Sequence, residues 1–253
     1  MKISLFQFSP VWENKNLNMQ NVLSVLKKKS ELGDIIVFPE MTLTGFSMNA
    51  SSLAEKMCDQ TIAFFSGIAS KYKADVFAGF IEKNGIGFYN TLFHIDSKGN
   101  LKAKYRKIHP FSYSKENKFY KAGDQIVVTK VKGWKIGLSI CYDLRFPELF
   151  RFYAKEKVDL ILNIANWPDS RIEHWRALLK ARAIENQCYV AAVNRVGKDL
   201  KLNYNGYSSI FDPMGKEIIS KKNIETILSA DLDKKFLEDV RRKLPFLNDI
   251  RLI

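Results

Sequence analysis

The sequence predicts an α/β fold with mixed sheets, and three observations support this class. Short apolar runs rich in β-branched and aromatic residues recur along the 253 residues. Helical patterns lie between several of these runs, as in layered α/β folds. The turn residues Gly99 and Asn100 separate two neighbouring runs, which indicates a local hairpin and hence some antiparallel pairing. Because no repeat or linker interrupts the pattern, we expect one domain over residues 1–253.

Eight segments are expected to be strands, because each is a short apolar run. These strand segments are residues 3–8, 35–38, 76–81, 89–95, 101–105, 136–140, 160–164 and 189–194. Apolar residues at three- and four-residue steps or helix-start signals predict four helices. These helix segments are residues 17–29, 53–72, 147–155 and 172–186. Pro147 suits a first helical turn, where its missing N–H is not needed.

The formal net charge of +13 raises the question of an anionic partner. The basic residues are dispersed along the chain and are not interleaved with stacking aromatics, so we expect a solvated surface and no nucleic-acid partner. No apolar stretch reaches the roughly 18 residues that a membrane helix needs, so no membrane partner is expected. The first residues lack the features of a signal peptide, which favours a cytoplasmic protein.

Three cysteines are too few for the disulfide framework of a small secreted domain, and they indicate a reducing compartment. Cys58, within a predicted helix, and Cys188, at a strand start, are interpreted as inert buried residues. The three histidines show no metal-ligand spacing, so no metal is expected.

Cys141 follows an apolar strand and precedes a proline-initiated helix, which is the context of a nucleophile elbow. A side chain at such a turn projects from the sheet edge, and the backbone N–H groups after it point toward a bound substrate. The helix N-terminus is also expected to favour the thiolate over the thiol. Cys141 is therefore the candidate nucleophile.

A cysteine nucleophile needs a base, and Glu40 is the candidate. It ends an apolar strand, and open α/β sheets place their sites at the carboxyl ends of strands. His109 and His174 remain alternatives, although neither lies in a setting that singles it out. Lys107 follows the strand segment 101–105, where an ammonium group would stabilise both a thiolate and a developing oxyanion.

These three residues lie in motifs that resemble those of the carbon-nitrogen hydrolase, or nitrilase-like, superfamily. The motifs are Phe38-Pro39-Glu40, Tyr105-Arg106-Lys107-Ile108-His109 and Ile140-Cys141-Tyr142-Asp143-Leu144-Arg145-Phe146-Pro147-Glu148, in the order that the family shows. The resemblance continues through Ala165-Asn166-Trp167-Pro168, residues 181–187, Asn194-Arg195-Val196-Gly197, Gly206-Tyr207-Ser208-Ser209 and Asp212-Pro213-Met214-Gly215. It thus covers nearly the whole chain.

The resemblance implies an αββα sandwich and a set of roles. Glu40 would be the general base, Cys141 would attack the amide carbonyl, and Lys107 with the backbone N–H of Tyr142 would stabilise the oxyanion. Glu116 matches a second glutamate of the family, which would position Lys107 and the substrate amide, although a solvated loop acid is the alternative. No cofactor is implied, and a homodimer is expected, with the segment 244–247 able to reach a neighbouring subunit.

Within the superfamily the sequence is most similar to omega-amidases, which hydrolyse the terminal amide of 2-oxoglutaramate and 2-oxosuccinamate. The small-molecule amide substrate would then carry a carboxylate. Arg145 is a candidate for binding that group, or it pairs structurally with Asp143 or Glu148. Asn166 and Trp167 are expected to line the pocket.

Two other classes of function stay open. N-carbamoyl amide and nitrile hydrolases share the same three residues, although a chain without the C-terminal extension common in nitrilases favours amides. A catalytically idle module that binds an acidic partner through its basic surface is the non-enzymatic alternative, which intact Glu40, Lys107 and Cys141 argue against.

Overall fold

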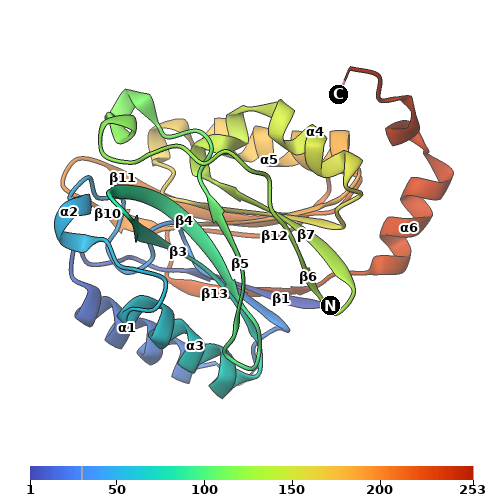
Figure 1. Cartoon of the computed structure of the whole chain (residues 1–253). Helices are drawn as coiled ribbons and strands as arrows, with labels where there is room; N and C mark the ends of the chain where they lie inside the picture. Colours follow the sequence, from blue (N-terminus) through green and yellow to red (C-terminus); the bar gives the residue numbers. More distant parts are fainter. Residues whose placement is uncertain (30, 253) are drawn as a thin grey trace.

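The computed structural model describes residues 1–29 and 31–252. Two β-sheets pack face to face, and helices cover the outer face of each sheet (Figure 1). Both sheets contain parallel and antiparallel pairs. The expected αββα sandwich with mixed sheets is therefore confirmed.

The first sheet pairs its central strands in parallel and its outer strands antiparallel. Its spatial order is β13 (Thr226–Asp231), β1 (Lys2–Gln7), β2 (Ile35–Val37), β3 (Asp75–Asn84), β4 (Gly87–Ile95) and β5 (Leu101–Arg106). The hairpin predicted around Gly99 joins β4 to β5, and Gly99 takes the positive φ of 88° that such a turn favours in glycine.

The second sheet also places parallel strands at its centre. Its spatial order is β10 (Val196–Lys198), β11 (Asn203–Phe211), β9 (Tyr189–Asn194), β8 (Leu160–Ala165), β7 (Trp134–Ile140) and β6 (Val128–Val131), and β12 (Glu217–Lys222) pairs with β11. Strands β6 and β10–β13 were not predicted.

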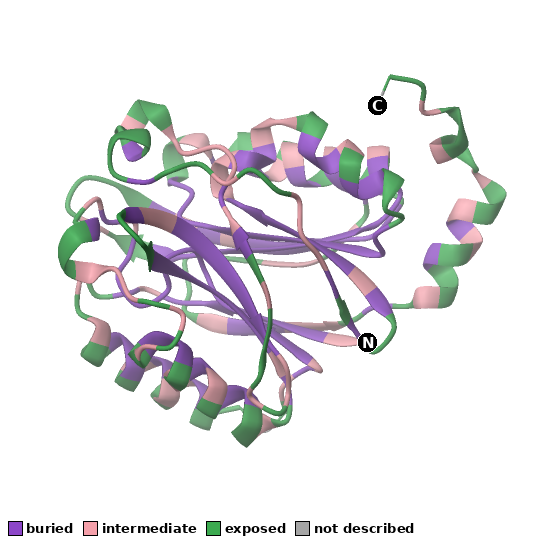
Figure 2. Cartoon of the chain, viewed as in Figure 1, coloured by how far each residue is buried: buried purple, intermediate pink, exposed green. Residues whose placement is uncertain are grey.

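Two pairs of helices form the outer layers of the sandwich. The helices are α1 (Lys15–Lys27), α2 (Ala50–Leu53), α3 (Gln60–Tyr72), α4 (Pro147–Lys155), α5 (Ile172–Asn186) and α6 (Lys234–Lys243). Helices α1 and α3 pack on the first sheet, while α4 and α5 pack on the second, and the other two helices, α2 and α6, belong to neither pair. Each of these helices buries one side and exposes the other (Figure 2).

The central core lies between the two sheets, because side chains alternate across a strand and each sheet sends one set inward. Leu5, Val37 and Phe77 of the first sheet share a buried cluster with Leu138 and Leu162 of the second. The sheets are therefore held in a fixed relation, and residues at the ends of strands from different sheets can meet.

The predicted helix 53–72 is wrong in its first part. Residues 54–59 lie between α2 and α3, and Glu55 pairs with strand β3 through its backbone. Its carboxylate also accepts the backbone N–H of Thr61 at 2.7 Å, at the start of α3. Tertiary pairing thus overrides the local helical pattern. Cys58 consequently lies outside the helix and is exposed, while Cys188 is buried as expected.

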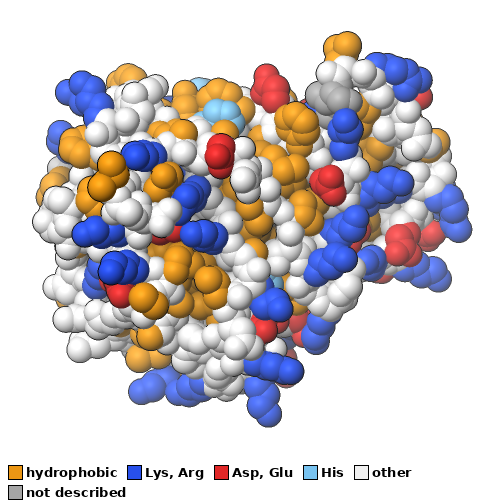
Figure 3. All heavy atoms as spheres, in the orientation of Figure 1, with side chains coloured by type: hydrophobic (Ala, Val, Ile, Leu, Met, Phe, Trp, Pro, Cys, Tyr) orange, Lys and Arg blue, Asp and Glu red, His pale blue; other side chains and the backbone are white. Residues whose placement is uncertain are grey.

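Lys and Arg side chains are spread over the face drawn in Figure 3, with Asp and Glu among them. Several of these basic side chains form ion pairs; Lys104 and Arg106, for example, both pair with Glu82. Among the described residues, no helix combines the length and apolar character needed to cross a membrane.

Candidate active site

The candidate site forms where strands of both sheets end. Glu40 follows β2, Cys141 follows β7, and Asn166 follows β8. Each of these strands has at least one parallel neighbour, and the carboxyl ends of parallel strands in α/β sheets are the usual place for a site. The backbone N–H of Asn166 donates to Glu40 Oε2 at 2.8 Å, and its side-chain amide donates to the Glu40 carbonyl at 2.7 Å. The two sheets are thus joined directly at the predicted base.

The turn that carries Glu40 is tight. Met41 has a φ of +45°, which is uncommon for a residue with a branched or bulky side chain. The chain here crosses strand β3 at Gly79, where an added Cβ would come within 2.7 Å of Met41 N and 2.9 Å of Glu40 Cα. Glycine therefore permits the close approach that brings Glu40 over the sheet.

Cys141 lies at a strand-to-helix elbow, as its sequence context predicts. Its φ is +46°, and a 3-10 helix (Cys141–Arg145) precedes α4, so the nucleophile is not at the N-terminus of the long helix itself. Such backbone conformations are costly and persist where surrounding contacts hold them. The elbow turns the chain sharply, and Cys141 lines the pocket described below.

Asp143 holds the elbow in place and is fully buried. Its carboxylate accepts hydrogen bonds from the Tyr105 hydroxyl at 2.7 Å, the Ile140 N–H at 2.9 Å and the His109 N–H at 3.0 Å. His109 Nδ1 lies 2.8 Å from the same carboxylate, and its ring stacks on Phe146 at 3.8 Å. His109 is thus engaged with Asp143. The sequence alone did not reveal this role.

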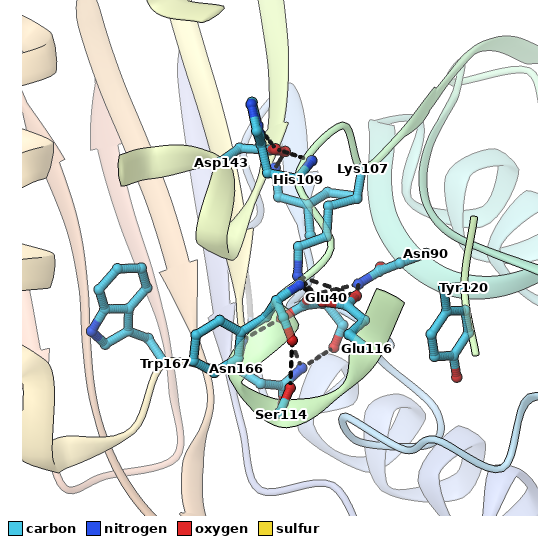
Figure 4. A network of polar contacts seen from close by, with 12 residues as sticks. Glu40, Asn90, Lys107, His109, Ser114, Glu116, Tyr120, Asp143, Asn166 and Trp167 are labelled. Atoms are coloured by element: carbon cyan, nitrogen blue, oxygen red, sulfur yellow. Dashed lines mark hydrogen bonds and ion pairs between the residues drawn. The ribbon is translucent and has the colours of Figure 1, made fainter. Parts of the chain in front are cut away.

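Glu40, Lys107 and Glu116 form one buried cluster (Figure 4). Lys107 Nζ lies 2.9 Å from Glu40 Oε1 and 2.9 Å from Glu116 Oε2. The Phe111 N–H donates to Glu116 Oε2 at 2.5 Å. Glu116 is therefore not the solvated loop acid of the alternative interpretation: it is 0% exposed and paired with Lys107.

Asn90 completes this cluster and was missed by the sequence analysis. Its side-chain amide donates to Glu40 Oε1 at 2.7 Å and to Glu116 Oε1 at 2.8 Å. The Lys107 backbone N–H in turn donates to the Asn90 carbonyl at 2.9 Å. The sequence did contain a sign of this role: Asn90 is a polar residue inside the predicted apolar strand 89–95, and a buried amide needs hydrogen-bond partners.

The electrostatics of the cluster favour a charged lysine and a neutral thiol. Burial on its own lowers the pKa of Lys107, but the Glu116 and Glu40 carboxylates outweigh burial and raise this pKa well above the ordinary lysine value. Burial and the Glu40 carboxylate raise the pKa of Cys141 well above the ordinary thiol value, although Lys107 lowers it. The expectation that the helix N-terminus favours the thiolate is therefore wrong for the resting protein, because burial and a nearby carboxylate outweigh it.

Burial also raises the pKa of Glu116, and the Glu40 carboxylate raises it further. The Lys107 ammonium lowers it, but the pKa of Glu116 remains above its ordinary value. One buried ammonium is thus shared between two carboxyl groups. Within the described ranges, no group of three His, Cys, Asp or Glu side chains is arranged to hold a metal ion.

A cavity of about 840 Å³ opens onto Cys141 and is lined largely by apolar and aromatic side chains. All four predicted substrate-binding residues line it: Tyr142, Arg145, Asn166 and Trp167. Other residues around the cavity had not been predicted, among them Trp12, Phe46, Phe111, Arg171 and Tyr204. They come from segments far apart in the sequence, so no local motif marks them.

Arg145 is half-buried in this cavity, and its guanidinium lies 4.7 Å from the centre of the Trp167 ring. Its Nη2 is 3.2 Å from His174 Nδ1. Neither Asp143 nor Glu148 forms an ion pair with it within the part of the chain that the structure describes. The structural alternative for Arg145, an ion pair with one of these two acids, is therefore not what the geometry shows.

Comparison with known proteins agrees with this fold and sequence pattern. Residues 2–242 match the carbon-nitrogen hydrolase family. A 2-oxoglutaramate amidase of Bacillus subtilis strain 168 is 32% identical over 98% of this chain and 97% of its own. Omega-amidase YafV of Escherichia coli strain K12 is 37% identical over 98% of this chain and 96% of its own. A crystal structure of a CN-hydrolase superfamily protein from Xanthomonas campestris superposes with a TM-score of 0.96 at 33% identity, covering 100% of this chain and 98% of that one.

The fold is thus that of the nitrilase superfamily, which confirms the resemblance found in the sequence. The chain belongs to the carbon-nitrogen hydrolase family and is an amidohydrolase.

Proposed function

We propose that this protein hydrolyses the terminal amide of a small carboxylate-bearing substrate, 2-oxoglutaramate or 2-oxosuccinamate, to the acid and ammonia. The observation that carries the proposal is the buried pairing of Lys107 with Glu40 and Glu116 at the cavity that Cys141 lines. The similarity to proteins named 2-oxoglutaramate amidase and omega-amidase supports the choice of substrate.

In the proposed acylation step, Glu40 accepts the thiol proton as Cys141 Sγ bonds to the amide carbonyl carbon. A base is required here because the raised pKa keeps the Cys141 thiol protonated at neutral pH. The carbonyl oxygen becomes an oxyanion, which the Lys107 ammonium and the Tyr142 backbone N–H stabilise. Glu116 and Asn90 position these groups.

Collapse of this tetrahedral species breaks the carbon–nitrogen bond. The proton held by Glu40 passes to the nitrogen, which leaves as ammonia, and a thioester remains on Cys141. Water then attacks the thioester while Glu40 accepts its proton, and the carbon–sulfur bond breaks. The acid departs, the proton returns to sulfur, and the thiol is restored.

The test is ammonia release from 2-oxoglutaramate, succinamate, an N-carbamoyl amino acid and a simple nitrile. We expect the largest kcat/KM for 2-oxoglutaramate, with succinamate next, because both carry a carboxylate at the end opposite the amide. Preference for the N-carbamoyl compound or the nitrile would support the proposed catalytic residues but contradict the proposed substrate. If none of the four compounds releases ammonia, the proposed activity is contradicted. A salt-sensitive gel shift with nucleic acid would then favour the binding-module alternative.

We also propose that the protein is a homodimer. Phe152 on α4 and Ile184 on α5 are each nearly half exposed, and Phe246 beyond α6 is 61% exposed. The C-terminal segment lies beside the sandwich (Figure 1), tied to it by a hydrogen bond from the Gln187 side chain to the Leu244 carbonyl at 2.7 Å. Light scattering should give twice the 29.2 kDa chain mass, and Phe246→Asp should lower it. A wild-type monomer would contradict the proposal.

A further inference from the structure

The cavity contains a second arginine that the proposed mechanism does not use. Arg171 is half-buried, and its guanidinium lies 5.7 Å from the centre of the Phe111 ring. The Arg145 guanidinium likewise lies over an aromatic ring, that of Trp167. The Trp167 indole N–H donates to the Arg171 backbone carbonyl at 2.8 Å, so the same tryptophan contacts the Arg145 guanidinium and the Arg171 backbone. Both arginine side chains line the cavity.

The Arg171 guanidinium has no ion pair and donates no hydrogen bond within residues 1–29 and 31–252. The two carboxylates that line the same cavity are already engaged. Glu13 accepts hydrogen bonds from Ser47 and Asn49, and Asp199 accepts from the Tyr204 hydroxyl at 2.6 Å. A half-buried cation without a counter-ion is costly, and a bound anion would relieve that cost.

Aromatic contacts connect Arg171 to the reacting end of the cavity. The Phe111 ring, which supports Arg171, lies 4.8 Å from the Tyr142 ring. Tyr142 directly follows Cys141, and its backbone N–H is the proposed oxyanion donor. Cys141, Arg145 and Arg171 line the same cavity, and Phe111 links Arg171 to the residue that follows the nucleophile.

We propose that Arg171 is a second, specificity-determining anchor, which together with Arg145 binds the 2-oxo carboxylate end of the substrate. A 2-oxo acid presents two carboxylate oxygens and an adjacent oxo oxygen, whereas a simple acid presents only the carboxylate. Two guanidinium forks can satisfy the larger set of acceptors, because each offers several donors in a fixed plane. The inference rests on the proposed amidase activity and adds the residue that selects the oxo acid.

The experiment compares Arg171→Gln with wild type on 2-oxoglutaramate, glutaramate and pentanamide, three amides of equal chain length. We expect kcat/KM to fall about 10- to 100-fold for 2-oxoglutaramate, mainly through KM, less for glutaramate, and under about twofold for neutral pentanamide. Arg171→Lys should recover part of the loss, because it keeps the charge without the fork.

Arg176→Gln is the matched control. Arg176 lies on α5, which begins directly after Arg171, and its guanidinium also lies over an aromatic ring, that of Tyr207 at 5.0 Å, yet it does not line the cavity. It should change none of the three rates by more than about twofold. An equal loss on all three amides would overturn the proposal, since Arg171 would then support the fold. No loss on any of them would overturn it too, and equal losses on the two anionic amides would overturn the assignment of the oxo oxygen.

Binding of 2-oxoglutarate, measured by calorimetry against glutarate, separates this inference from the proposed function. If wild type fails to hydrolyse 2-oxoglutaramate, the proposed function fails. Weaker 2-oxoglutarate binding by Arg171→Gln, with glutarate less affected, would still support the anchor. Equal binding of 2-oxoglutarate by the two proteins would overturn it.

Discussion

Cys141→Ala should lower ammonia release from 2-oxoglutaramate by about 10⁴-fold or more, because no other group at the site can form the thioester. The change removes one sulfur atom at the edge of the cavity and leaves the Lys107 ion pairs with Glu40 and Glu116 in place. The variant should therefore unfold at nearly the wild-type temperature, as measured by circular dichroism.

The two other cysteines provide matched controls. Cys58 is exposed and Cys188 is buried against α5 and the second sheet, and neither lines the cavity. Cys58→Ala and Cys188→Ala should keep the wild-type rate. An active Cys141→Ala protein, or loss of activity in both controls, would refute Cys141 as the nucleophile.

Lys107→Met should abolish turnover and also destabilise the protein by about 3–5 kcal/mol. Both effects have one cause: the substitution leaves Glu40 and Glu116 buried without their shared ammonium partner. Urea unfolding and the rate of amide hydrolysis measure the two effects on the same sample. A variant that loses activity at unchanged stability would show that the cluster is not held together by its charge.

The loss of stability in Lys107→Met should grow with pH. The Lys107 ammonium lowers the pKa of Glu116, so its removal raises this already elevated pKa further. A carboxyl group whose folded pKa lies above its unfolded value is favoured in the protonated form. Its folded state loses stability as pH rises from the ordinary value of 4.5 through the folded pKa. Destabilisation should thus be smaller at pH 5 than at pH 8.

Lys104→Met is the control for removing a positive charge nearby in the sequence, from β5, the strand that Lys107 directly follows. Lys104 is partly exposed and pairs with Glu82, which keeps Arg106 as a partner after the substitution. Lys104→Met should lower the free energy of unfolding by less than about 1 kcal/mol and should hydrolyse the amide at the wild-type rate. A pH dependence of equal size in both variants would refute the assignment to the buried cluster.

The sequence by itself determined the fold class, the central strand segments, and Glu40, Lys107, Glu116 and Cys141 as candidates for the proposed mechanism. These conclusions depend on local signals. An apolar run predicts a buried strand wherever it lies in the chain, and Glu40 and Cys141 each follow such a run directly. Glu40 and Cys141 follow strands of different sheets, so their meeting at one site depended on how the two sheets pack.

The tertiary structure alone decided which side chains hold the site together. Asn90 bridges Glu40 and Glu116, and Asp143 engages His109, through contacts between residues 26 to 50 positions apart. The same holds for the placement of Arg171 beside Trp167, and for the pairing of Glu55 that ends the predicted helix. Local propensity and periodicity contain no information on such pairs, because the free energy that favours them exists only when the two sheets have packed.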